Sequence, residues 1–281
     1  MIPAPFAYVR PSSLTEAVAA LRDSGDEAKV LAGGQSLLPL LRLRLAYPEV
    51  LVDVGALPEL QGVQDEGSSL LVGAMTTHYE VMRDPLIREH CPLLAAATST
   101  VADPAVRHRG TLGGSLAHAD PAGDLPAVAL AMEAVFVTSS REIPAQEFFA
   151  DYLTSALHPD EILLGVRLPK SYAGWGFHYE KFHRTAQAWA IVGVACLVRR
   201  SDGEVAEARI GLTNMGSAPV RAAAVEAAVT GGSASREAFR AAAEHAPEGT
   251  SPPSDLHGSA DYRRHLATVL TARALATAAS V

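Results

Sequence analysis

Cysteine is scarce in this chain: only Cys91 and Cys196 occur among its 281 residues, far apart and without a CxxC companion. Iron–sulfur clusters and cysteine-rich zinc sites need several closely placed thiolates. The sequence therefore excludes a cysteine-held cluster, and we expect both thiols to pack as small hydrophobic side chains. The ten histidines show no HxH or HExxH spacing, so we predict no metal site.

Long apolar runs and basic runs are also missing. No stretch reaches the roughly 18–20 apolar residues that a membrane span needs. The N-terminus, "MIPAPFAYVRPSSLTEAV", lacks the charged and apolar regions of a signal peptide, so we expect a soluble, cytoplasmic protein. The net charge is −8 and only three of the 23 basic residues are lysines. Without a basic stripe, the sequence predicts no nucleic-acid partner.

What the chain has is 48% hydrophobic residues, enough to bury one large domain or two smaller ones. Residues 13–25 predict a short helix with a capping box of Ser13 and Glu16, ended by Gly25. A buried strand at 28–32, a helix from Ser36 to about Leu45 and a strand at 49–55 follow. This order is a βαβ unit, so its two strands should be parallel.

After residue 54 the pattern becomes α+β, with strands and short helices in no regular alternation. Strands are expected at 69–76, 134–139, 161–169, 190–200 and 205–215, the last two joined by a turn at 201–204. A cluster of proline and glycine at 168–176 indicates a break. We therefore expect one domain at about 1–170, with subdomains near 1–54 and 55–170, and a second domain at 171–281.

Two adjacent-glycine pairs stand out, one in "LAGGQSLL" and one in "RGTLGGSLAHADPAGDLP". Neither fits the P-loop, because no Gly-Lys dipeptide occurs, and neither has the GxGxxG spacing of a Rossmann turn. Glycine permits positive φ and a close approach of backbone N–H groups to a ligand. Two such turns facing each other could hold a diphosphate, with help from Ser36 and Ser115. The alternative is two unrelated tight turns.

The surroundings of the two pairs add a resemblance. Residues 32–60 and 77–126, with "KFHRTAQAWAIVGVA" and "DYRRHLATVLTARAL" further on, resemble the FAD-binding medium subunit of the molybdenum hydroxylases. That family includes aerobic carbon monoxide dehydrogenase and the xanthine dehydrogenase group, and the resemblance runs the length of the chain. It implies a two-subdomain FAD-binding fold of the vanillyl-alcohol-oxidase/p-cresol-methylhydroxylase type, followed by a small α+β C-terminal domain.

The resemblance also implies which residues bind FAD, non-covalently. Backbone N–H groups of two motifs would wrap the diphosphate, and Asp120 would accept a hydrogen bond from a ribose or ribityl hydroxyl, unless it only caps a helix. The motif residues are Ala32, Gly33, Gly34, Gln35, Ser36 and Leu37 in the first, and Thr111, Gly113, Gly114 and Ser115 in the second. Relatives often carry His in place of Gln35 and Asn in place of Ser115, and both replacements still form hydrogen bonds.

Three further residues would lie at the flavin ring in such a protein. Leu163 would pack against the ring, and Lys181 would stabilise the negative charge of the reduced flavin, unless it is a surface lysine. Trp189 would stack on the ring or belong to the core. Relatives usually precede this tryptophan with Asp, where this chain has Ala188.

The function implied is electron transfer, with no catalytic residue in this chain. A large molybdopterin subunit would oxidise the substrate, and a small iron–sulfur subunit would pass the electrons to this FAD, in a dimer of heterotrimers. The external acceptor would be a quinone, NAD or oxygen. One alternative is a self-contained FAD oxidoreductase of the vanillyl-alcohol-oxidase type. Another is an assembly protein that has lost its flavin.

Overall fold

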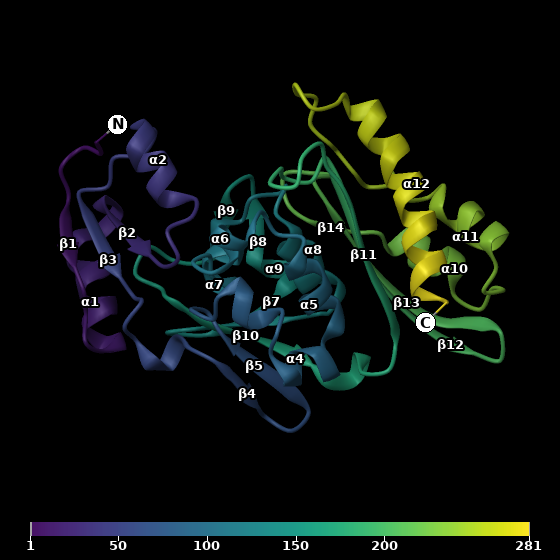
Figure 1. Cartoon of the computed structure of the whole chain (residues 1–281), viewed down its shortest axis with the longest axis horizontal. Helices are drawn as coiled ribbons and strands as arrows, with labels where there is room; N and C mark the ends of the chain where they lie inside the picture. The colour runs from purple at the N-terminus through teal and green to yellow at the C-terminus, as the bar shows by residue number, and fades with distance from the viewer. Residues whose placement is uncertain (1, 281) are drawn as a thin grey trace.

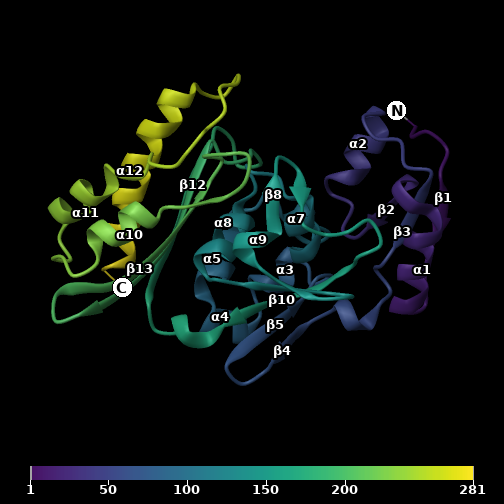
Figure 2. The ribbon, with the colours of Figure 1, turned by 180° about the vertical axis from the view of Figure 1, so that it is seen from behind.

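The computed structural model describes residues 2–280 and contains three main β-sheets, which follow one another in chain order along the long axis (Figure 1). The N-terminal sheet lies at one end, a helix-rich middle unit comes next, and the C-terminal helices lie at the other end. The view from behind shows the same order (Figure 2). None of the helices in residues 2–280 has the length and apolar character needed to cross a membrane.

The N-terminal sheet has three parallel strands in the order β1-β3-β2. The parallel pairing of β2 with β3 confirms the predicted βαβ unit. Strand β2 lies at an edge, and for that reason only Ala28 in it is buried, although the sequence predicted a buried strand. The elements are β1 (Ala7–Val9), α1 (Leu14–Ser24), β2 (Ala28–Leu31), α2 (Leu37–Leu43) and β3 (Val50–Asp53).

The two helix starts differ in detail from the prediction. Ser13 caps α1, but the Glu16 carboxylate bonds the backbone N–H of Ser12 at 2.8 Å and not that of Ser13. Ser36 occupies the N-cap position of α2 without a side-chain cap bond. That helix ends at Leu43, two residues early, because Arg44 adopts the left-handed conformation with φ 56°.

The middle unit is a five-stranded antiparallel sheet of order β4-β5-β10-β6-β7, packed against short helices. The expected strands at 69–76, 134–139 and 161–169 are present as β5, β6 and β10. The strands are β4 (Val63–Asp65), β5 (Ser69–Gly73), β6 (Val135–Thr138), β7 (Glu142–Pro144) and β10 (Leu163–Pro169), with a separate ribbon of β8 (Phe149–Asp151) and β9 (Thr154–Ser155).

Two helices of the middle unit, α7 and α8, were not predicted from the sequence. The second glycine pair lies inside α7 and not in a turn, because the Thr111 side chain caps the helix start by accepting from the Gly114 N–H. The helices are α3 (His78–Val81), α4 (Pro85–His90), α5 (Pro92–Ser99), α6 (Pro104–Arg107), α7 (Leu112–His118), α8 (Asp124–Ala131) and α9 (Ala145–Phe148).

The C-terminal unit is a four-stranded antiparallel sheet with three helices on its outer face (Figures 1 and 2). Strands β12 and β13 form the predicted pair, whereas β11 was missed. The middle unit's helix α8 packs on the inner face, against β13. The elements are β11 (Gly176–Phe182), β12 (Val192–Ser201), β13 (Glu204–Thr213), β14 (Val220–Arg221), α10 (Ala223–Val229), α11 (Arg236–Ala243) and α12 (Ala260–Ala278).

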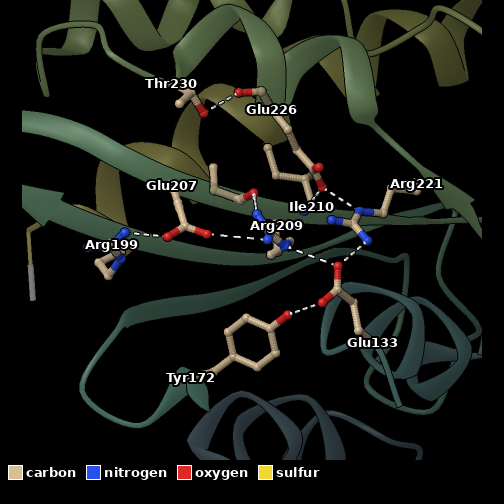
Figure 3. A network of polar contacts seen from close by, with 10 residues as sticks. Glu133, Tyr172, Arg199, Glu207, Arg209, Ile210, Arg221, Glu226 and Thr230 are labelled. Atoms are coloured by element: carbon tan, nitrogen blue, oxygen red, sulfur yellow. Dashed lines mark hydrogen bonds and ion pairs between the residues drawn. The ribbon is translucent and has the colours of Figure 1, made fainter. Parts of the chain in front are cut away.

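One carboxylate, that of Glu133, joins the middle unit to this sheet (Figure 3). It accepts a hydrogen bond from the Tyr172 hydroxyl at 2.6 Å and pairs with Arg209 at 3.2 Å and Arg221 at 2.8 Å. Arg221 also pairs with Glu226 at 2.8 Å. The network fixes the position of the C-terminal sheet, whose strand β11 reaches the cleft described below.

A second carboxylate, that of Glu161, ties the loop before β10 to β6. It accepts from the Thr138 hydroxyl at 2.5 Å, the Ser140 hydroxyl at 2.8 Å and the His158 N–H at 3.0 Å, and it pairs with Arg141 at 3.1 Å. Burial alone would raise the pKa of this carboxyl, but the Arg141 guanidinium and the other donors lower it to about 2. The loop is therefore held by an ionised Glu161.

Replacing Glu161 should test this anchor through pH. Because its folded pKa is depressed, the ionised carboxylate stabilises the fold above the unfolded pKa near 4.5, and this contribution is lost as the pH falls toward 2. We expect Glu161→Gln to lower the free energy of unfolding by roughly 1–3 kcal/mol at pH 7. The difference from wild type, measured by urea unfolding, should shrink below pH 4.5. A difference that does not change with pH would contradict the assignment.

Candidate functional site

A cleft of about 1160 Å³ opens where the three units meet. His78 and four separate stretches of the chain line it: parts of residues 21–49, 101–124, 153–161 and 181–189. All three units contribute, so the cleft exists only when the N-terminal sheet, the middle unit and the C-terminal sheet are assembled.

The two glycine motifs lie side by side at this cleft. A Cβ on Gly33 would stand 2.2 Å from the Arg109 carbonyl oxygen and 2.8 Å from Gly110 Cα. A Cβ on Gly114 would stand 3.5 Å from Ala32 Cβ and 2.7 Å from the Thr111 hydroxyl oxygen. Because Gly33 has no side chain, the first loop can contact the second. The two glycine pairs are therefore not unrelated turns.

Positive φ explains only one of the four glycines. Gly34 has φ 72°, whereas Gly33, Gly113 and Gly114 are not in the left-handed region. Gly113 is needed for packing, because a Cβ there would stand 2.4 Å from Ala74 Cβ, and it does not line the cleft. Of the four, only Gly34 is therefore needed for its backbone conformation, whereas close contacts account for the others.

The first loop presents a run of unpartnered backbone donors. Among residues 2–280, the N–H groups of Gly33, Gly34, Gln35, Ser36 and Leu37 have no hydrogen-bond acceptor, and all five residues line the cleft. The Gln35 side chain is used locally, since its amide donates to the Gly33 carbonyl at 3.1 Å. Consecutive N–H groups directed at one space form a site for an anion such as a phosphate.

The second loop is arranged differently, because most of its N–H groups are satisfied by the protein itself. Leu112 donates to the Thr76 carbonyl at 2.9 Å, Gly113 to Ala74 at 2.9 Å and Ser115 to Thr111 at 3.0 Å. The Gly114 N–H donates to the Thr111 hydroxyl at 3.2 Å. Within the described part of the chain, the donors of this loop that line the cleft without a partner are the Thr111 N–H and the Ser115 hydroxyl.

Asp120 lines the cleft beyond the second loop. Its Oδ1 accepts from the Ala122 N–H at 2.9 Å and so closes a tight turn. The next helix, α8, is capped by Gly123, so the helix-cap alternative for Asp120 is wrong. Its second carboxylate oxygen has no partner among residues 2–280 and is placed to accept a hydrogen bond from a ligand hydroxyl.

Asp124 and Lys181 form an ion pair at the inner wall, with side chains 4% and 3% exposed. Lys181 Nζ lies 2.7 Å from Asp124 Oδ2 and 3.0 Å from the Thr100 carbonyl oxygen. The Tyr179 hydroxyl donates to Asp124 Oδ1 at 2.7 Å. Burial raises the pKa of Asp124, while Lys181 and Tyr179 act in the opposite direction. Lys181 is therefore not a surface lysine, and it faces the cleft as half of a neutral pair.

The remaining predicted ring contacts lie in different places. Trp189 lines the cleft and is 52% exposed, so it does not belong to the core. Leu163 starts β10, is 6% exposed and packs in the core of the middle unit, away from the cleft lining. Its contact with the flavin stays a prediction to which the geometry gives no support.

Sequence reasoning missed two cleft residues, Asp124 and His78. Asp124 could have been noticed as the second carboxylate of "ADPAGDLP", four positions after Asp120. His78 is 4% exposed, and its Nδ1 is buried without a partner in residues 2–280. Burial, and then the charge of Arg107, lower the pKa of His78 to about 4, so the ring is neutral at neutral pH. Its backbone N–H also holds the Gly110 carbonyl, at 2.9 Å.

These features fit a dinucleotide bearing an aromatic ring. Unpartnered N–H groups suit a diphosphate, the free oxygen of Asp120 suits a sugar hydroxyl, and Trp189 offers a flat apolar surface. A diphosphate here would be held by main-chain dipoles. The fold and the cleft thus define a nucleotide-cofactor protein built on two packed glycine loops.

Comparison with known proteins identifies the cofactor. Residues 4–171 match the family model of the FAD-binding domain in molybdopterin dehydrogenase. Residues 177–278 match that of the carbon monoxide dehydrogenase flavoprotein C-terminal domain. The chain belongs to this family of FAD-binding subunits, and FAD is its cofactor.

Individual relatives span nearly the whole chain. The carbon monoxide dehydrogenase medium chain of Hydrogenophaga pseudoflava is 41% identical over 98% of this chain and 97% of its own length. The 6-hydroxypseudooxynicotine dehydrogenase complex subunit alpha of Paenarthrobacter nicotinovorans is 36% identical over 99% and 96%. A structure of the Hydrogenophaga carbon monoxide dehydrogenase superimposes with a TM-score of 0.96 and 44% identity, covering 99% of this chain and 98% of that one.

Gly33→Ala should separate the two loops. The new methyl group would stand 2.2 Å from the Arg109 carbonyl oxygen, a distance that the backbone can relieve only by moving. We expect at least a tenfold rise in the FAD dissociation constant, measured by fluorescence titration, because the loops then no longer line one site. Gly232→Ala, outside the cleft lining, is the matched control and should bind FAD normally, because Gly232 also lacks a positive φ and its Cβ would stand no closer than 3.3 Å to another atom. Equal FAD affinity in both variants would contradict the packing argument.

Lys181→Met should leave a buried carboxylate without its partner. Removing one member of a buried pair costs about 3–5 kcal/mol, so the variant should unfold at clearly lower urea concentration than wild type. Adding Asp124→Asn should restore much of the loss. Lys170→Met provides the control, because Lys170 pairs with Asp65, whose side chain is 45% exposed, and such pairs contribute at most about 1 kcal/mol. Similar losses for the two lysines would refute the buried pair.

Proposed function

We propose that this chain is the medium subunit of a molybdenum hydroxylase. It receives electrons from iron–sulfur clusters on a small partner chain and delivers them through FAD to an external acceptor. A large molybdopterin chain oxidises the substrate, and the three chains assemble as a dimer of heterotrimers. The observation that carries the proposal is the cleft, which is lined by the five residues 33–37 with unpartnered N–H groups, by Asp120 and by Trp189.

The roles of the residues follow from their positions. The N–H groups of residues 33–37 bind the diphosphate, assisted by the hydroxyls of Ser36 and Ser115. The free oxygen of Asp120 accepts a hydrogen bond from a sugar or ribityl hydroxyl, and Trp189 covers an apolar part of the cofactor. FAD, when bound, supplies a centre that accepts and releases electrons. The Asp124–Lys181 pair presents a neutral, hydrogen-bonded wall.

The chain's own side chains support an electron-transfer role. Cys91 and Cys196 are both fully buried, in different hydrophobic cores. Burial raises the pKa of Cys91 to about 12, and burial likewise raises that of Cys196. These two thiols neither meet nor reach the surface, so the clusters of the proposed enzyme belong to another chain.

The fold that we propose for FAD binding is of the vanillyl-alcohol-oxidase/p-cresol-methylhydroxylase type. The division into domains at 1–170 and 171–281, with subdomains at about 1–54 and 55–170, is supported by the separate sheets. The cleft lies between these units. Such a division places one glycine loop in each N-terminal subdomain.

A self-contained FAD oxidoreductase is the competing function. It would need a base beside the flavin, and two carboxylates of the cleft lining, Asp124 and Glu161, are already engaged by Lys181 and Arg141. The relatives are named as chains or subunits of larger enzymes, and their names refer to carbon monoxide and to 6-hydroxypseudooxynicotine. Such different substrates on similar chains favour a substrate site outside this subunit.

Anaerobic reduction of the isolated chain tests the proposal. The FAD-loaded chain should be bleached by dithionite and reoxidised by an acceptor dye. Carbon monoxide, purines, aldehydes and N-heterocycles should leave the visible flavin absorbance unchanged, because the site that activates the substrate lies on another chain. Fast bleaching by one of these compounds, with no other protein present, would establish the self-contained oxidoreductase instead.

A further inference from the structure

The sequence contains a single asparagine, Asn214, directly after the end of β13. It is 7% exposed and adopts the left-handed conformation with φ 62°. Asn is one of the few residues with a side chain that tolerates this conformation, because its short amide can bond the local backbone. Here, however, the amide bonds a segment distant in the sequence.

Asn214 connects two walls of the FAD cleft. Its side-chain Nδ2 donates to the Ala190 carbonyl at 2.8 Å, and Ala190 follows the cleft residue Trp189. Its backbone N–H donates to the Pro121 carbonyl at 2.8 Å, and Pro121 follows the cleft residue Asp120. Asn214 therefore bonds the residue that follows Trp189 and the residue that follows Asp120.

The segment that carries Trp189 depends on few such anchors. Residues 183–189 are mostly exposed and connect β11 to β12. The base of the segment is closed by the Ile191 N–H, which donates to the Phe182 carbonyl at 2.8 Å, and by Arg263, which donates to the Ile191 carbonyl. Within the segment, the Gln187 side-chain amide donates to the Asp103 carboxylate. Asn214 is the anchor nearest to Trp189, because it holds the very next peptide group.

We propose that Asn214 is a positioning residue for the cofactor: through Ala190 it fixes Trp189 at the cleft, in register with the Asp120 turn. The inference rests on the proposed FAD site. According to this inference, the C-terminal domain lines the FAD site and also fixes the position of Trp189 in it. The preceding residue supports this, since the Thr213 hydroxyl lies 3.3 Å from the Tyr179 hydroxyl that holds Asp124.

Asn214→Gly is the appropriate variant. Glycine keeps the left-handed backbone and the N–H that bonds Pro121, and it removes only the amide that holds Ala190. We expect the FAD dissociation constant to rise about five- to tenfold, the effect of losing one buried hydrogen bond. The bound flavin's absorbance spectrum should shift in the same direction as in Trp189→Ala. Asp202→Gly is the matched control, because Asp202 also has positive φ, 51°, but lies in the distant β12–β13 turn.

A double-mutant cycle distinguishes positioning from general stability. In a Trp189→Ala background, Asn214→Gly should cause no further loss of FAD affinity, because the side chain it positions is gone. The same loss in both backgrounds, or wild-type affinity in Asn214→Gly, would overturn the inference. Failure of the proposed function would look different, because wild type and the Asp202→Gly control would then also bind no FAD.

Discussion

The contact on which the rest of the site depends is the approach of Gly33 to the Arg109–Gly110 peptide. No side chain fits between these two backbones, since a Cβ would stand 2.2 Å from the carbonyl oxygen. This contact brings a loop of the parallel N-terminal sheet against a loop of the antiparallel middle unit. The unpartnered N–H groups of residues 33–37 thus belong to a loop that lines the same cleft as Thr111 and Ser115 of the second loop.

The two loops differ in the number of free N–H donors. The first supplies unpartnered donors, whereas the second uses its N–H groups to bond Thr76, Ala74 and its own cap, Thr111. The second loop thereby supports the first and has few donors to spare. The C-terminal unit adds a third wall through Lys181 of β11 and residues 187–189. The neutral Asp124–Lys181 pair keeps this wall polar without a net charge, which suits a cofactor whose charge changes on reduction.

Much of this could be predicted from the sequence, for physical reasons. The βαβ unit follows from apolar runs separated by glycine and a short helix, and the glycine pairs mark close backbone contacts. Other features have no local signal. The Asp124–Lys181 pair joins residues from α8 and β11, and Asn214 acts on Ala190 and Pro121, which only the tertiary fold brings near. The helix α7 was missed because Gly113–Gly114 is typical of turns, and tertiary packing on Ala74 overrides that preference.

Amide hydrogen exchange with and without FAD tests the central claim most directly, because it reports the partners of individual N–H groups. The account predicts that FAD slows exchange at residues 33–37, whose N–H groups have no acceptor among residues 2–280. Residues 112–115, already bonded within the protein, should exchange slowly in both states and change little. FAD-dependent protection confined to 112–115, with none at 33–37, would contradict the account.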